Sequence, residues 1–244
     1  MWSETRRPEV LERVIGHSDV KRTLHSYFQS PASRTLLLYG PPGIGKTTLA
    51  LAATRSYGYE ALEINASRSL RSFGDVETLI QSCRHSRSIS SMIRGDNSPL
   101  CLVLDEIDGS DPHAQRKLVE WMIGPDRKIP IVMTCNEVPR IMKQKEAIEL
   151  VRCYPPSATD LIGLFPDQDV PKLAKRFKHD VRRILQFLQY GDSDILPSGS
   201  APSECSPEVS HILHQRMWTE TDPMVLANAI ETPSSHSSHS SYAP

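Results

Sequence analysis

The sequence predicts an α/β fold: a mostly parallel sheet flanked by helices, then a small helical lid and a short helical C-terminal piece. Three observations predict it. A glycine-rich loop at Gly40–Thr47 lies between a short apolar run and a helical stretch. Further short apolar runs end in polar residues and are separated by helical patterns. From residue 157 onward these runs give way to short helices.

The loop reads G-P-P-G-I-G-K-T and fits the phosphate-binding (P-loop) pattern G-x-x-x-x-G-K-[ST] at every fixed position. Its glycines let backbone N–H groups turn toward phosphate oxygens, and the helix N-terminus adds partial positive charge. We expect Lys46 to neutralise the β- and γ-phosphates and Thr47 to bind Mg²⁺. A glycine-rich turn that matches by chance is the alternative, which the flanking strand and helix disfavour. The predicted nucleotide-binding residues here are Gly40, Pro41, Pro42, Gly43, Ile44, Gly45, Lys46, Thr47 and Thr48.

Composition bounds the class of protein without identifying it. Lysine and arginine total 28 against 29 acidic residues, so any contact with nucleic acid must come from a local patch or a partner chain. The cysteines number five and never have C-x-x-C spacing, which argues against a disulfide framework and a zinc site. No apolar run approaches the roughly 18 residues that span a bilayer. We therefore expect a soluble, intracellular protein.

The pattern along the chain predicts five strands, seven helices and five regions. We expect strands at 36–39, 61–65, 100–104, 129–134 and 149–154, and helices at 19–27, 48–57, 75–83, 113–122, 159–164, 170–178 and 180–190. The regions are a nucleotide-binding domain at 1–156, a lid at 157–191, a linker at 192–207, a short helical segment at 208–231 and a disordered Ser/His-rich tail at 232–244.

A second chemical constellation follows the apolar strand at 100–104, where Asp105 and Glu106 stand together. Open α/β sheets place ligand-contacting groups at the carboxyl ends of their strands. Asp105 could hold Mg²⁺, and Glu106 could deprotonate the water that attacks the γ-phosphate. Asn136, at the end of the next strand, is a candidate to sense that phosphate. A surface turn is the alternative for the acidic pair, and the start of a turn is the alternative for Asn136.

Residues 66–94 form the locally basic part of the chain, with arginines outnumbering acids. A solvated surface is the commoner meaning of such a run, and contact with nucleic acid is the other. In the lid, Arg182 could reach the nucleotide phosphates or be an ordinary solvated charge. The basic residues of the run are Arg68, Arg71, Arg84, Arg87 and Arg94.

Taken in order, these motifs resemble the AAA+ ATPases, and within them the sliding-clamp loaders, most of all the large subunit of replication factor C. The resemblance covers roughly residues 1–190. The matching segments are Trp2…Arg7-Pro8…Val14-Ile15-Gly16-His17, Ile64-Asn65-Ala66-Ser67, Leu104-Asp105-Glu106-Ile107-Asp108-Gly109, Lys128-Ile129-Pro130-Ile131 with Cys135-Asn136, and Asp180-Val181-Arg182.

The resemblance implies a role for each matching residue and a set of partners. Lys46 and Thr47 would bind phosphate and Mg²⁺, Asp105 would assist the metal, and Glu106 would be the catalytic base. Asn136 would be sensor 1, Arg182 sensor 2, and Val14 and Ile15 would lie at the adenine. The cofactors would be ATP and Mg²⁺. The partners would be other clamp-loader subunits, a sliding clamp and primer–template DNA, with Arg84 and Arg87 as DNA contacts and the nucleus as location.

Small clamp-loader subunits carry a Ser-Arg-Cys motif whose arginine completes a neighbour's ATP site. Val151-Arg152-Cys153 resembles it only superficially, because Arg152 lies inside the last predicted strand and Lys145–Ile148, at the finger position, contains no arginine. The chain should therefore receive an arginine finger and donate none, as a large subunit does. Fewer than sixty residues follow Tyr190, whereas the family's collar domain needs roughly a hundred.

The predicted function is thus an ATP-dependent clamp-loader subunit of the large-subunit type. Two alternatives stay open. One is a nucleotide-binding scaffold subunit without significant turnover, which the short lid and truncated collar favour. The other is a different AAA+ remodelling ATPase, which is disfavoured because no pore-loop motif of aromatic and glycine follows the second strand.

Overall fold

The computed structural model describes residues 7–30, 34–84, 98–143, 146–162 and 169–190. The chain divides into two units, residues 1–195 and 196–244, and every described residue belongs to the first. The predicted linker, C-terminal helical segment and tail lie outside the described residues, as do Trp2 and Arg87.

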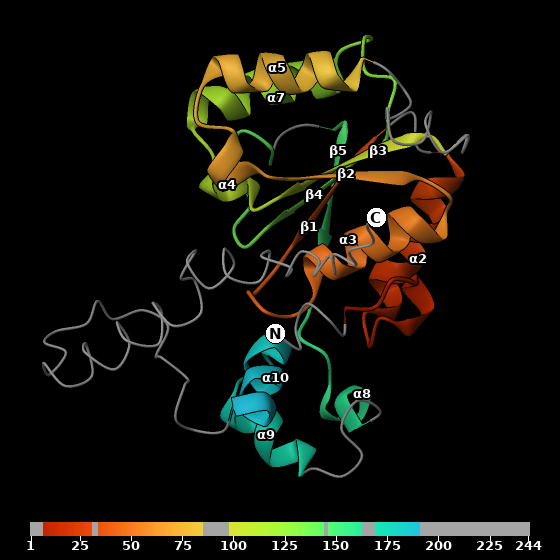
Figure 1. Ribbon diagram of the computed structural model, residues 1–244, viewed down its shortest axis with the longest axis vertical. Helices are drawn as coiled ribbons and strands as arrows, with labels where there is room; N and C mark the ends of the chain where they lie inside the picture. Colours follow the sequence, from red (N-terminus) through yellow and green to blue (C-terminus); the bar gives the residue numbers. More distant parts are fainter. Residues whose placement is uncertain (1–6, 31–33, 85–97, 144–145, 163–168, 191–244) are drawn as a thin grey trace, which may run out of the picture. The chain divides into compact units, whose positions relative to one another are not determined.

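The described strands form one parallel sheet in the order β2-β3-β4-β1-β5 (Figure 1). The strand that precedes the phosphate loop, β1, lies between β4 and β5, so the chain crosses over to build both sides of it. In such a sheet all carboxyl ends meet at one edge, where ligands bind. The strands are β1 Thr35–Tyr39, β2 Glu60–Asn65, β3 Leu100–Asp105, β4 Ile131–Cys135 and β5 Ile148–Arg152.

Helices cover both faces of the sheet, α5 and α7 on one face and α2 and α3 on the other (Figure 1). Successive strand residues point to opposite faces. Accordingly Leu102 and Leu104 join the apolar cluster under α5 and α7, while Cys101 and Val103 join the cluster under α2 and α3. The central strands are buried on both faces, as the continuous apolar runs predicted.

Side-chain caps set where several helices begin. Ser72 and Asp75 form a capping box at the start of α5, and Asp111 accepts backbone N–H groups at the start of α7, where Pro112 stands in the first turn. The helices of the sheet-containing part are η1 Leu11–Arg13, α2 Ser18–Gln29, α3 Lys46–Ser56, α4 Ala66–Ser69, α5 Phe73–Cys83, η2 Ile107–Gly109 and α7 Pro112–Ile123.

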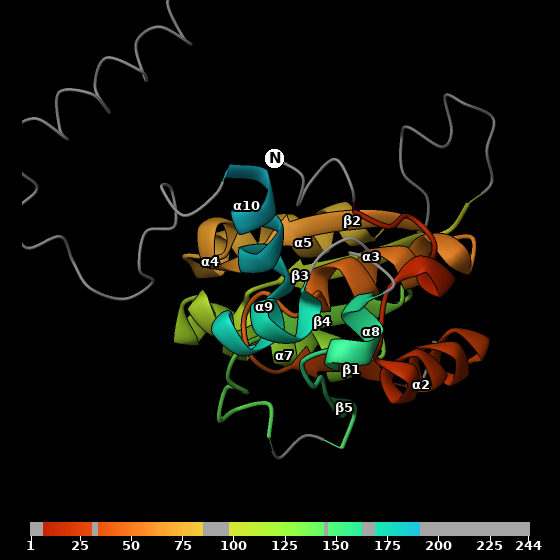
Figure 2. The ribbon, with the colours of Figure 1, turned by 90° about the horizontal axis from the view of Figure 1, so that it is seen from below.

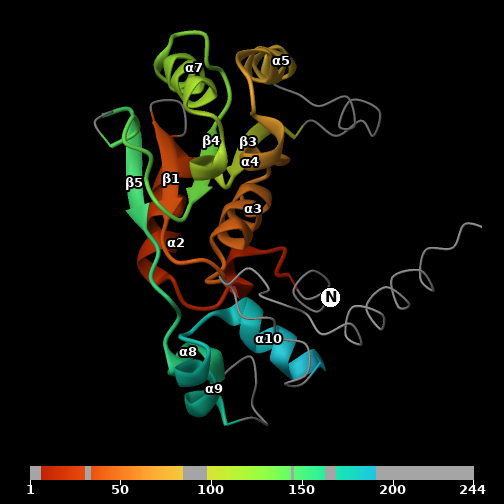
Figure 3. The ribbon, with the colours of Figure 1, turned by 90° about the vertical axis from the view of Figure 1, so that its left-hand side faces the viewer.

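Three further helices form the predicted lid: α8 Ala158–Ile162, α9 Val170–Arg176 and α10 Val181–Tyr190. They group together (Figure 2) and lie apart from the sheet (Figure 3). Their core is separate from the two clusters of the sheet and consists of Leu161, Val170, Leu173, Ala174, Phe177 and Ile184. On the last helix, Ile184 is buried and Val181, Leu185 and Leu188 pack beside it.

All five predicted strands and all seven predicted helices are present, with shifts of a few residues at their ends. The last strand ends at Arg152 instead of Tyr154, whose side chain is exposed. Arg152 lies inside that strand, as predicted. The cysteines of the described segments, Cys83, Cys101, Cys135 and Cys153, are buried and free. Among the described residues, no helix has the length and apolar character needed to cross a membrane.

Candidate nucleotide-binding site

A pocket opens at the carboxyl ends of β3 and β4, between the phosphate loop and the start of α10. It gathers residues from the N-terminal segment, the loop, two strands and the lid. Its lining consists of Arg7, Pro42, Gly43, Gly45, Lys46, Thr47, Thr48, Asp105, Glu106, Thr134, Cys135, Asn136, Val181, Arg182 and Leu185.

Gly43 and Gly45 are needed in the loop for different reasons. Gly43 and Gly45 have φ angles of +75° and +99°, in the left-handed region that favours glycine. At Gly45 an added Cβ would meet nothing within 4 Å, whereas at Gly43 it would lie 2.0 Å from Oδ1 of Asp180. Gly43 therefore also makes room for the lid.

Lys46 is nearly buried, with 8% of its surface exposed, and its ammonium group is held by three acceptors. Nζ donates to the carbonyl oxygens of Gly40 at 2.9 Å and Pro41 at 2.7 Å, and to Oδ1 of Asn136 at 3.0 Å. Burial lowers the pKa of the ammonium group. The lysine thus joins the loop to the end of β4, and the two predicted phosphate contacts, Lys46 and Asn136, lie side by side.

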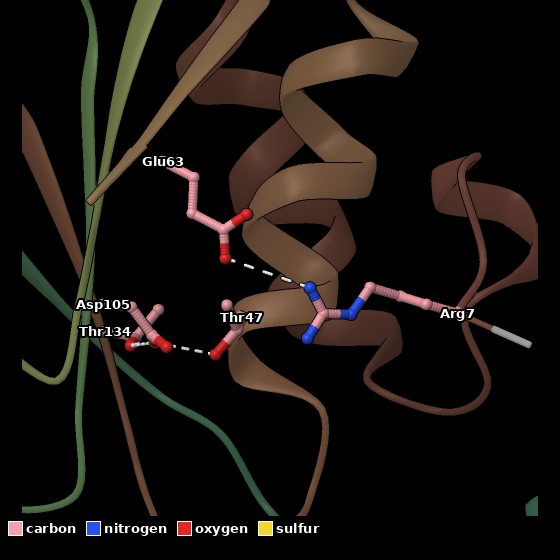
Figure 4. A network of polar contacts seen from close by, with 5 residues as sticks. All are labelled: Arg7, Thr47, Glu63, Asp105 and Thr134. Atoms are coloured by element: carbon pink, nitrogen blue, oxygen red, sulfur yellow. Dashed lines mark hydrogen bonds and ion pairs between the residues drawn. The ribbon is translucent and has the colours of Figure 1, made fainter. Parts of the chain in front are cut away.

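Asp105 receives two hydroxyl groups on one oxygen (Figure 4). Thr47 donates to Oδ1 at 2.7 Å, and Thr134, from the neighbouring strand, donates to the same atom in a short hydrogen bond. Mg²⁺ prefers hard oxygen ligands and is commonly held by one or two carboxylates, waters and substrate phosphates. The Thr47 hydroxyl and the Asp105 carboxylate fit that preference. Among the described residues, no three or more His, Cys, Asp or Glu side chains cluster so that they could hold a metal ion.

Glu106 follows Asp105 in a left-handed backbone conformation, with φ of +55°. Its Oε2 accepts hydrogen bonds from Nδ2 of Asn65 and from the hydroxyl of Ser67, each at 3.0 Å. These bonds, that of Asn65 foremost, lower the pKa of the Glu106 carboxyl group below its ordinary value. The carboxylate is therefore held in its ionised form, which a general base requires.

Other partners of the site carry no distinct sequence signal of their own. Asp108 accepts hydrogen bonds from the backbone N–H groups of Asn136, at 3.0 Å, and Glu137, at 3.2 Å, and so fixes the end of β4. Arg7 lines the pocket and lies 3.9 Å from Glu63 on β2 (Figure 4). In the sequence, Arg7 and Asp108 stood out only as parts of longer matching segments. Thr134 was not predicted to be a site residue.

The lid meets the loop through backbone atoms. The carbonyl oxygen of Gly43 accepts the N–H groups of Val181, at 3.1 Å, and Arg182, at 3.4 Å. The next carbonyl, that of Ile44, is hydrogen-bonded to Nε2 of His17 at 2.9 Å. The phosphate loop therefore fixes both the start of α10 and the start of α2. Arg182 also lines the pocket, and its contact with the nucleotide phosphates stays a prediction.

Some predicted residues lie beside the pocket and not in its lining. Val14 and Ile44 are buried in the apolar cluster under α2 and α3, and Ile15 is half-buried. Gly40 and Pro41 contribute their carbonyl oxygens to Lys46. Arg84 is exposed at the end of α5, away from the pocket lining. The adenine contacts of Val14 and Ile15 stay predictions.

Comparison with known proteins gives this geometry a family. Residues 36–149 match the model for the ATPase family associated with various cellular activities (AAA). The replication factor C large subunit of Sulfurisphaera tokodaii is 34% identical over 159 residues, which make up 62% of this chain and 35% of that protein. The large subunit of Thermococcus kodakarensis is 30% identical over 209 residues, or 77% of this chain and 40% of that protein.

Among solved structures, the Thermotoga maritima RuvB Holliday junction branch migration motor superposes with a TM-score of 0.57. That match has 19% sequence identity and covers 75% of this chain and 64% of RuvB, so it supports the fold alone. The chain spans well under half the length of the replication factor C subunits above, 35% and 40% respectively. Residues 36–149, which contain the phosphate loop and the acidic pair after β3, are therefore an AAA ATPase domain.

Proposed function

We propose that this protein is an ATP-dependent subunit of a sliding-clamp loader, of the large-subunit type, which helps to place a clamp on primed DNA. The observation that carries the proposal is that Lys46, Thr47, Asp105, Glu106 and Asn136, from three different parts of the chain, line one pocket. The similarity to replication factor C large subunits supplies the choice of complex.

Each of these five residues, together with Arg182, has a proposed role. Lys46, which already lies among oxygen acceptors, would pair with the β- and γ-phosphates, and Asn136 beside it would orient the γ-phosphate. Bound Mg²⁺ would neutralise charge that develops on the phosphates, with Thr47 and Asp105 as its protein ligands. Glu106, kept ionised, would accept a proton from the attacking water. Arg182 would bring a second cation from the lid.

A cation supplied by a neighbouring subunit would complete the site. Arg152, the last residue of β5, is not proposed as a finger for a neighbour. Its guanidinium group lies 5.0 Å from the ring centre of Tyr154 and so makes a cation–π contact within its own chain. A finger in trans is worth about 10³–10⁵ in rate in this reaction class. We therefore propose that the chain alone hydrolyses ATP slowly and that small clamp-loader subunits stimulate it.

The basic surface of α4 and α5 is the proposed contact with DNA. Arg68, Arg71 and Arg84 are exposed there, on the segment that follows β2. Such contacts would go to the phosphate backbone and would carry no sequence preference. Replacing Arg84 by alanine should weaken stimulation by primed DNA and reduce its salt dependence, since one phosphate contact fewer releases fewer counterions.

The deciding experiment is ATP turnover by the purified chain, first alone and then with small clamp-loader subunits, a sliding clamp and primed DNA. Lys46→Ala and Glu106→Gln should abolish the stimulated rate. Lys172→Ala should not, because that lysine is exposed on α9 and pairs with Asp169 outside the pocket. Binding of ATP with background turnover under all conditions would favour the scaffold alternative. Clamp loading that persists in Glu106→Gln would do the same.

A further inference from the structure

Thr134 lies at the point where the backbone pairing of β3 and β4 ends. The register pairs run from Leu102 with Ile131 to Leu104 with Met133, and Asp105 and Thr134 come directly after the last pair. Thr134 is almost completely buried, with 1% of its surface exposed, yet it lines the nucleotide pocket. A buried polar side chain at the end of a ladder needs hydrogen-bond partners, and here they are the two acidic residues.

The hydroxyl group of Thr134 both donates and accepts a hydrogen bond. It donates its proton to Oδ1 of Asp105 (Figure 4), and its oxygen accepts the backbone N–H of Glu106 at 3.3 Å. One hydroxyl therefore contacts the side chain of the first acid and the main chain of the second. Side-chain hydrogen bonds here take over where the backbone ladder of the two strands stops.

Glu106 gives this arrangement its physical purpose. Its φ of +55° lies in the left-handed region, which residues other than glycine occupy at a cost and only where their surroundings hold them. In this conformation the carboxylate accepts hydrogen bonds from Asn65 and Ser67. Thr134 accepts a hydrogen bond from the backbone N–H of Glu106 and so stabilises that conformation.

Asp105 gains orientation from the same contact. Thr47 and Thr134 approach the same carboxylate oxygen from opposite elements, α3 and β4. While its proton is directed to Asp105, the Thr47 oxygen keeps its lone pairs for a cation. Two donors on one oxygen also restrict rotation of the carboxylate, as partners of metal-binding groups commonly do.

We propose that Thr134 is a positioning residue that couples the two acids of the site, setting Asp105 for Mg²⁺ and Glu106 for the attacking water. This inference rests on the proposed nucleotide-dependent function and goes beyond it. It states that one hydroxyl group on β4 positions both acidic residues at the end of β3. Thr134 itself touches neither the nucleotide nor the metal in this scheme.

The test compares Thr134→Val, which keeps the shape and removes the hydroxyl, with Thr134→Ser, which keeps the hydroxyl and removes a methyl group. Binding of a fluorescent ATP analogue is titrated against Mg²⁺ and also measured in EDTA. Thr134→Val should raise the half-saturating Mg²⁺ concentration about 10–100-fold, the usual range for a lost partner of a metal ligand. Affinity in EDTA should stay close to that of the unsubstituted chain, and Thr134→Ser should restore most of the Mg²⁺ dependence.

Thr134→Ala provides a second variant without the hydroxyl and should show the same Mg²⁺ shift even if valine disturbs folding. Equal defects in the serine and valine variants would overturn the inference, because they would assign the effect to packing. An unshifted Mg²⁺ dependence in both valine and alanine variants would also overturn it while leaving the proposed function intact. Failure of the unsubstituted chain to bind the analogue would overturn both.

Discussion

The floor of the pocket, formed by Asp105, Glu106 and Thr134, and its lid, formed by helices α8–α10, hold their functional groups in different ways. On the floor, Asp105 and Glu106 are fixed by side-chain hydrogen bonds at the ends of strands that are buried on both faces. In the lid, Arg182 is exposed, and the start of its helix is held by backbone bonds to Gly43. The floor is thus built to keep a geometry, whereas the lid takes its position from the phosphate loop.

The two regions also differ in how much core supports them. Leu104 and Ile107, which flank the two acids in the sequence, are fully buried in an apolar cluster that extends across the sheet. The lid relies on a smaller apolar cluster of its own. Regions with few buried contacts open at lower free energy than a central sheet. We therefore expect hydrolysis to depend on the floor, and nucleotide retention to depend on the lid.

The largest expected effect is on the floor. Glu106→Gln should lower stimulated ATP turnover by about 10²–10⁴-fold, the range for a general base, with nucleotide affinity nearly retained. Glu137→Gln is the matched control, since Glu137 is exposed and contacts the site through its backbone N–H. Steady-state turnover and binding of an ATP analogue measure both. A full rate in Glu106→Gln would show that another group accepts the proton.

A pair of core truncations tests the difference in support. Leu104→Ala should lower the free energy of global unfolding by about 2–5 kcal/mol, because it leaves a cavity in the sheet. Ile184→Ala removes a similar volume from the lid and should act locally. Hydrogen exchange should accelerate throughout the sheet in the first variant and mainly in α8–α10 in the second. Equal acceleration in both regions would show that floor and lid unfold as one unit.

The glycines of the loop separate strain from lid contact. Gly43→Ala and Gly45→Ala each force alanine into a left-handed conformation, at a cost of about 1–3 kcal/mol. Only at Gly43 does the added methyl group collide with Asp180. Gly43→Ala should therefore weaken nucleotide binding more than Gly45→Ala. Combining Gly43→Ala with Asp180→Gly should recover part of the difference, and no recovery would remove the lid from the explanation.

Much of the fold and the chemical centre could be predicted from local patterns. Apolar runs and the spacing from Gly40 to Thr47 predict strand, loop and helix because each depends on neighbouring residues in sequence. Asp105 and Asn136 were expected together since parallel strands end at the same edge. Both residues line the same pocket at that edge.

The supporting contacts could not be predicted in the same way. Thr134 is one polar residue in an apolar strand, and nothing local reveals that its hydroxyl meets two acids from another strand. Nor does the sequence show that Gly43 faces Asp180, more than a hundred residues later. Such contacts depend on strand order and on lid placement, which a local pattern does not encode. The nucleotide contacts expected of Val14 and Ile44, both buried in the cluster under α2 and α3, stay predictions.

The smallest expected effect concerns the acidic limb of the pH–rate profile, and it again separates floor from lid. The hydrogen bond from Asn65 lowers the pKa of Glu106, so the base stays ionised as pH falls through the ordinary carboxyl range. Asn65→Ala removes that bond and should raise the pKa, so activity should be lost at a higher pH during acidification. Asn65→Asp should move the limb further in the same direction, because it places a negative charge beside Glu106.

Ser67→Ala serves as the graded control, since the Ser67 bond contributes less than that of Asn65 to the lowered pKa. Its acidic limb should move in the same direction by a smaller amount. Profiles of kcat/KM under stimulated conditions report the base of the free enzyme. A limb that stays in place in all three variants would mean that Glu106 does not set it. Arg182→Ala should also move the limb to higher pH but by less than Asn65→Ala, because the charge of Arg182 is a smaller cause of the lowered pKa of Glu106 than the Asn65 bond. A larger shift in Arg182→Ala than in Asn65→Ala would contradict this order.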